Sequence, residues 1–154
     1  MAIYAKFNGI NGSVTTEGFS QWIALSEFQW GYQAGGRGVA EHGREVTVSN
    51  ITLKMRAEQA SVDLAQKGLS RANISKVQIA FTSTGKDSVK PYLTYDLTNV
   101  MLENYSIGGG TDGVPIETLG LSFQKVTFKF TSLDASLTGS PRSITYDLTQ
   151  AKTS

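Results

Sequence analysis

The chain has 154 residues, of which 40% are hydrophobic and 18% are charged, as expected for one globular domain that can bury a core. Its 14 Lys and Arg nearly balance its 13 Asp and Glu, and no basic run occurs, so the sequence offers no dedicated surface for nucleic acid. The chain contains no cysteine, which excludes disulfides and thiolate chemistry. We therefore expect a single domain over residues 1–154 that binds no nucleic acid.

The N-terminal stretch MAIYAKFNGING is the first feature along the chain. It has no basic segment followed by a continuous apolar stretch, so we expect no cleavable signal peptide. No segment approaches the apolar length that is needed to span a bilayer, so we also expect no membrane insertion. Export from the cell would then require a dedicated machine.

Apolar residues alternate with polar ones in several short segments, and many of them are β-branched or aromatic. These segments contain Ile3, Ala5 and Phe7; Val77, Ile79 and Phe81; Leu93, Tyr95 and Leu97; and Ile144, Tyr146 and Leu148. A period of two places such residues on one face of a half-buried strand. The pattern predicts a mainly β fold.

Two segments, residues 21–32 and 117–130, change the phase of this alternation midway. In the second segment the apolar residues switch from odd to even numbers. A β-bulge produces such a one-residue slip and bends the strand so that both halves still face the core. We predict bulges near Ser26 and Glu27 and near Gln124 and Lys125. Long bent antiparallel strands favour a small closed or nearly closed β-barrel, which removes exposed edges.

One segment, residues 56–72, breaks the β pattern. Four apolar residues share one face at helical spacing, namely Ala57, Ala60, Leu64 and Ala65. Gly68 is well placed to end the helix in a left-handed conformation. The segment predicts one α-helix over about residues 57–67, flanking the barrel.

Catalytic and metal-binding residues are scarce. His42 is the only histidine, and it lies in a glycine-rich loop that is poorly suited to hold a general base in place. With no cysteine, no second histidine and no acidic cluster, the sequence predicts no metal site. We expect no enzyme activity, no catalytic residues and no cofactor.

A glycine cluster, YSIGGGTDGVP, occupies residues 105–115. Gly108, Gly110 and Gly113 have the G-x-G-x-x-G spacing of dinucleotide-binding loops, but such a loop needs a helix to follow it, and an alternating strand follows here. The cluster is better explained as a connector between two long strands, with Asp112 and Gly113 in the turn. Its residues are Gly108, Gly109, Gly110, Asp112 and Gly113.

Three stretches, WIALSEFQWGYQAGGRG, ISKVQIAF and YSIGGGTDGVPIETLGLSFQKVTFKF, give the chain a resemblance to the Hcp (haemolysin co-regulated protein) family of type VI secretion. The resemblance implies a small β-barrel with a flanking helix that assembles into hexameric rings, and the rings stack as a tube. It also implies partners: a VgrG-like spike protein, contractile sheath proteins and small effectors carried in the lumen. The protein would stay in the bacterial cytoplasm until firing and then be secreted to the extracellular space or a target cell.

The same resemblance marks the loop after the Trp30-Gly31 pair, residues 35–45, as a contact with a neighbouring subunit or ring. Its candidate polar contacts are Arg37, His42, Arg44 and Glu45. Two other functions stay open from the sequence. One is a phage-like tail tube protein, and the other is a monomeric β-barrel that binds a ligand in its interior.

Overall fold

The computed structural model describes residues 1–34, 46–84, 88–131 and 141–154. Within these residues the elements in chain order are β1 (Ala2–Phe7), β2 (Ile23–Gln29), β3 (Tyr32–Ala34), β4 (Val46–Val48), β5 (Ile51–Arg56), α1 (Ser61–Leu69), β6 (Ile74–Thr84), β7 (Val89–Gly108), β8 (Ile116–Phe130), β9 (Arg142–Asp147) and β10 (Lys152–Thr153). The mainly β fold with one flanking helix is confirmed for the described part of the chain.

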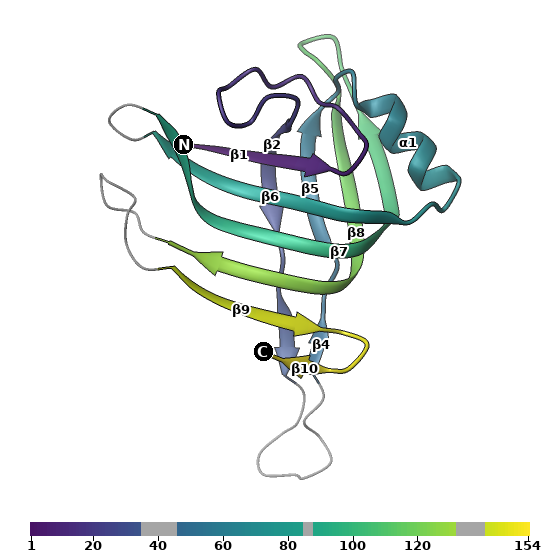
Figure 1. The fold of residues 1–154 in the computed structure, drawn as a ribbon. Coiled ribbons are helices and arrows are strands. Elements are labelled where there is room, and N and C mark those ends of the chain that lie inside the picture. The colour runs from purple at the N-terminus through teal and green to yellow at the C-terminus, as the bar shows by residue number, and fades with distance from the viewer. Residues whose placement is uncertain (35–45, 85–87, 132–140) are drawn as a thin grey trace.

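Six antiparallel strands close into a barrel. Their order is β8–β5–β2–β1–β6–β7, and β7 pairs again with β8 to complete the circle. Beyond β8 the sheet continues through β9 and β10, while β3 and β4 pair only with each other (Figure 1). The predicted closed barrel is therefore confirmed, and the β3–β4 ribbon extends from it.

The long strand β8 changes its neighbour halfway along. Residues 116–121 pair with β5, residues 125–130 pair with β9, and β7 accompanies β8 along both halves. In Figure 1, β2, β5 and the first half of β8 run upright, whereas β1, β6 and β9 cross them. We call the four strands β2, β5, β8 (116–121) and β7 (102–108) the upright layer.

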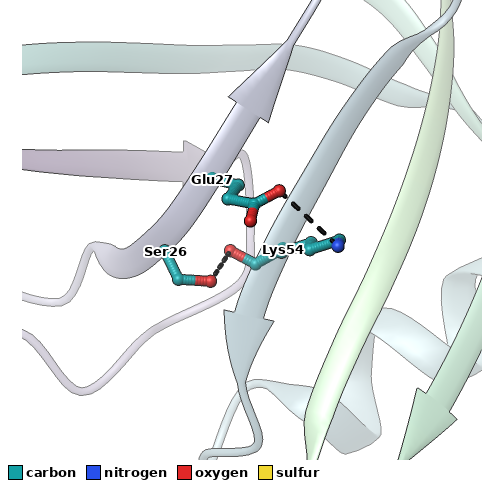
Figure 2. Close-up of polar contacts among 3 residues, drawn as sticks. All are labelled: Ser26, Glu27 and Lys54. Atoms are coloured by element: carbon teal, nitrogen blue, oxygen red, sulfur yellow. Dashed lines mark hydrogen bonds and ion pairs between the residues drawn. The ribbon is translucent and has the colours of Figure 1, made fainter.

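The first predicted bulge is confirmed in β2. Leu25 pairs with Met55 and Glu27 pairs with Lys54, which leaves Ser26 as the extra residue. Figure 2 shows the Ser26 hydroxyl donating to the Lys54 carbonyl at 3.2 Å and an ion pair of 3.5 Å between Glu27 and Lys54. Because the Lys54 side chain is 42% exposed and the Glu27 side chain is 67% exposed, water screens the ion pair and it adds little stability. The bulge matters because β2 stops pairing with β1 at this point.

The prediction of a second bulge near Gln124 and Lys125 is wrong, because the strand pairing does not shift register there. The buried face of β8 does change there, but the pairs on either side keep one register because Asn99 of β7 stands opposite Gln124. Asn99 has a φ of 53°, and its amide donates to the Gln124 side chain. In both strands the buried side chains change from odd to even residue numbers around this pair. The register shift between β7 and β8 lies instead between Leu102 and Asn104.

Helix α1 begins and ends later than the predicted range of about 57–67. Ala57 is held in the preceding turn because its N–H donates to the Pro115 carbonyl at 2.9 Å. The Ser61 hydroxyl accepts the N–H of Glu58 at 2.9 Å, so the last residues before α1 form a turn. Side-chain acceptors of this kind favour the start of a helix over its interior.

The end of α1 also differs from prediction. Gly68 lies inside the last turn, and the left-handed residue is Arg71, with a φ of 56°. The apolar face is confirmed in its centre, since Ala60 and Leu64 are buried against the barrel. The sequence showed a glycine at a plausible cap position, but the chain turns after the helix through a non-glycine residue.

Candidate functional site

The second half of β7 forms one open edge of the upright layer. Residues 102–108 pair with β8 on one side, and β6 reaches only as far as Val100 on the other. Among the described residues no further strand pairs with this segment, and α1 packs beside it. An open edge presents unpaired N–H and C=O groups that can accept another strand.

The opposite edge of the same layer is open as well. Since β1 pairs only with residues 23–25, the part of β2 after the bulge keeps β5 as its single neighbour. The chain then passes through Trp30 and Gly31 into β3, which pairs only with β4. Within the part of the chain that the structure describes, a second open edge therefore runs over residues 27–34.

The two edges are complementary in direction. The pairings β2–β5, β5–β8 and β8–β7 are all antiparallel, so β7 runs antiparallel to β2. Three strand spacings, about 14 Å, separate the two edges, and they cannot meet within one chain. A second copy in the same orientation would bring its residues 27–34 antiparallel to residues 102–108.

Apolar side chains are exposed beside both edges. At the β7 edge, Tyr105 and Ile107 are about half exposed, and Leu69 at the end of α1 is 88% exposed. At the opposite edge Tyr32 is 65% exposed. Apolar side chains gathered at unpaired strand edges are typical of surfaces that meet a partner.

A buried carboxylate lies behind the β7 edge. Glu117 of β8 is the only charged side chain among the described residues that is fully buried. Its carboxylate accepts the Ser61 hydroxyl at 2.5 Å and the Tyr105 hydroxyl at 2.6 Å. Buried carboxylates need such donors to offset lost hydration. Glu117 thereby ties the first residue of α1 to the open strand β7.

The same contact shifts the titration of Tyr105. The hydrogen bond to Glu117, together with partial burial and the negative charge of Glu117, raises the pKa of Tyr105 to about 12. Tyr105 therefore keeps its proton and donates to Glu117 over the whole physiological pH range. Ionisation of Tyr105 therefore does not break the contact between α1 and β7 within that pH range.

A family model described as "Type VI secretion system effector, Hcp" matches residues 4–130. The chain belongs to the Hcp family. The resemblance noted in the sequence is thus confirmed, and Hcp membership supports the role of a secreted structural subunit of the type VI secretion tube. No curated protein matches the chain.

Solved Hcp structures have the same fold. A structure described as a type six secretion system protein has a TM-score of 0.87 and 21% identity, covering 99% of both chains. Hcp1 from Salmonella typhimurium has a TM-score of 0.80 and 21% identity, covering 99% of this chain and 98% of its own. A type VI secretion system effector from Yersinia pestis has a TM-score of 0.78 and 21% identity, covering 94% and 98%.

The extended-loop residues proposed to make contacts between Hcp subunits fall between β3 and β4. Arg37, His42, Arg44 and Glu45 lie outside the described residues. Their role stays a prediction, although the open β3 strand leads directly into this loop.

The glycine connector lies at the tip of the β7–β8 hairpin. Gly108 ends β7, and Gly109, Gly110, Asp112 and Gly113 precede β8, which is a strand as predicted and provides no helix N-terminus for a pyrophosphate. None of the connector glycines has a positive φ. An added Cβ would find open space at Gly108, Gly110 and Gly113, and only Gly109 is crowded, by Pro115 at 3.2 Å. The turn therefore does not depend on left-handed glycines.

The described residues also bear on metal binding and membrane insertion. Within residues 1–34, 46–84, 88–131 and 141–154, no group of three or more His, Asp and Glu could hold a metal ion. In the same ranges no helix is long and apolar enough to cross a membrane.

Sequence reasoning missed the two open edges and the Glu117 cluster. The edges depend on which strands pair across the barrel, and no local pattern reveals that. Glu117 did carry a signal, because it has the same parity as the buried Leu119 and Leu121. A charged residue at a buried position of a strand indicates a polar partner inside the fold.

Proposed function

We propose that the chain forms hexameric rings that stack into the inner tube of a type VI secretion system. The observation that carries this proposal is the pair of open, antiparallel edges on opposite sides of the upright layer. Residues 102–108 of each copy pair with residues 27–34 of the next. This contact is heterologous, one surface meeting a different one, and such contacts form rings when the rotation closes. The upright layers then join into one continuous sheet around a lumen.

The tube that results has the partners of the family. Contraction of the sheath proteins expels the tube behind a VgrG-like spike, and small effectors travel in the lumen. The subunit resides in the bacterial cytoplasm before firing and is released to the extracellular space or a target cell afterwards. Family membership and the fold support this sequence of events.

Negative-stain electron microscopy of the purified chain tests the proposal. We expect ring-shaped particles, with tubes at high protein concentration. Particles of monomer size at every concentration would overturn the proposal and favour a monomeric ligand-binding barrel. If rings form, comparing culture supernatants with and without an intact secretion machine separates a secreted tube, which requires the machine, from a phage-like tail tube, which does not.

We propose that the loop of residues 35–45, which lies between β3 and β4 in the sequence, joins stacked rings, as the family resemblance implies. Arg44→Glu reverses a charge at this contact, so we expect rings to persist while tubes disappear. Lys76→Glu makes the same charge change on an exposed position of β6 and should leave tubes intact. Tubes of normal length and number from Arg44→Glu would remove this loop from the stacking contact.

A further inference from the structure

A groove of about 450 Å³ lies between α1 and the open edge of β7. Leu64 and Leu102 contribute to its apolar lining, and the exposed Leu69 stands at its margin. Glu103 and Asn104 also border it, but the Glu103 carboxylate accepts the Ser122 hydroxyl and the Asn104 side chain lies over Gly120, both on the opposite face of the layer. Figure 1 shows α1 beside the upper parts of β7 and β8, where Glu117 ties the first residue of α1 to β7. The groove is thus an apolar slot on the barrel side of the upright layer.

The opposite open edge carries an aromatic side chain in the matching position. Phe28 and Trp30 alternate along this edge and pack against the core, so they point to the barrel side of the layer. Tyr32 continues the alternation, and its ring centroid lies 6.3 Å from that of Trp30. Unlike those two residues, Tyr32 is 65% exposed. It projects from the barrel side of one edge, where it borders a hollow of about 240 Å³ beside Val48 and Tyr146 and keeps most of its surface exposed.

We propose that Tyr32 of one copy occupies the α1–β7 groove of the next copy. This inference rests on the proposed ring, because it is the antiparallel pairing of residues 27–34 with residues 102–108 that brings the two together. Extending a sheet across two copies keeps their barrel sides on one side, so Tyr32 and the groove face the same way. The occupant is a second copy of this chain.

The apolar character of the two surfaces matches. A tyrosine buries a large rigid apolar area, and the groove offers it the side chains of Leu64, Leu69 and Leu102. Gly68 keeps the slot open on the helix side, since a Cβ there would meet Leu102 at 3.5 Å in ordinary contact. Alanine therefore fits at position 68, but a longer side chain would fill the space that Tyr32 needs.

The test uses one variant on each side of the contact. Tyr32→Ala removes the occupant and Gly68→Leu fills the groove, and each is expected to raise the protein concentration at which half of the chain is in rings by at least about tenfold, the cost of losing an aromatic anchor. Tyr32→Phe and Gly68→Ala are the matched controls and should change it by less than about threefold. Mass photometry measures the ring fraction, and circular dichroism establishes that each variant is folded.

Mixing the two variants separates a contact from a general loss of stability. A Gly68→Leu copy still presents Tyr32, and a Tyr32→Ala copy still presents an open groove, so the mixture should give dimers that neither variant forms alone. Rings at normal concentration from both variants would overturn the inference while leaving the proposed ring intact. Loss of rings in both variants without dimers on mixing would also overturn it. Absence of rings from the unchanged chain would instead overturn the proposed function.

Discussion

Oxidation of a chain that carries both Gln29→Cys and Ser106→Cys is expected to yield a covalent ladder of oligomers that ends at the closed ring. The two positions lie on the opposite open edges of the upright layer and are both exposed. The chain has no cysteine of its own, so every disulfide must join engineered positions. Within one chain the edges are about 14 Å apart, whereas disulfides require Cα atoms within about 7 Å. Each bridge must therefore connect two copies.

The register of the contact can be found with the same approach. Gly31→Cys and Gln33→Cys move the first cysteine by two residues at a time on the side of the layer that Gln29 shares. One register should cross-link far more efficiently than the other two, as read from non-reducing gels. Chains that carry only one of the two cysteines should give no ladder. A mixture of the two single-cysteine chains should give cross-linked dimers and nothing larger. If none of the three registers cross-links although rings are visible by microscopy, the ring closes through other surfaces.

The barrel could be predicted because strand faces follow a strict period of two. The phase change in residues 21–32 correctly predicts the bulge at Ser26, which is an extra residue with no partner on β5. The same phase change in β8 does not mark a bulge, because the sequence of one strand does not reveal whether its partner strand has an irregularity at the same level. Asn99 of β7 carries its own irregularity opposite Gln124, so the two strands stay in register. A phase change locates a bend, and only the partner strand decides whether it is a bulge.

The surfaces proposed for assembly were not predictable in the same way. Residues 102–108 have the polar and apolar mixture of an ordinary exposed strand, and they form an edge only because β6 stops at Val100. Likewise, residues 27–34 become an edge because β1 pairs no further than Leu25. Both facts follow from pairings between segments far apart in the chain. The ring is a proposal that the family resemblance suggests, and the pairings indicate which strands could close it.

Glu117→Ala is expected to lower the free energy of unfolding by about 3 kcal/mol. The change removes two hydrogen bonds to a charged group, each worth about 1.5–3 kcal/mol, and leaves a cavity, while relief of the buried charge offsets part of the loss. Urea denaturation measures the difference. Glu27→Ala is the matched control, since it removes an exposed carboxylate and should cost less than about 1 kcal/mol. Equal stability of the two variants would show that the buried carboxylate does not hold the fold together.

Titration of Tyr105 identifies the carboxylate contact directly. Its pKa is raised from 10.0 to about 12 mainly by the hydrogen bond to Glu117, so folding stabilises the protonated tyrosine. That contribution is complete below pH 10 and is lost as the pH rises from 10 through 12. In Glu117→Gln the charge is absent, so the pKa should fall toward 10, seen as earlier tyrosinate absorbance in a difference spectrum against Glu117→Gln with Tyr105→Phe. An unchanged titration would contradict the contact. A confirmed shift would locate the Glu117 carboxylate beside Tyr105, where the hydroxyl of Ser61 at the start of α1 donates to it as well.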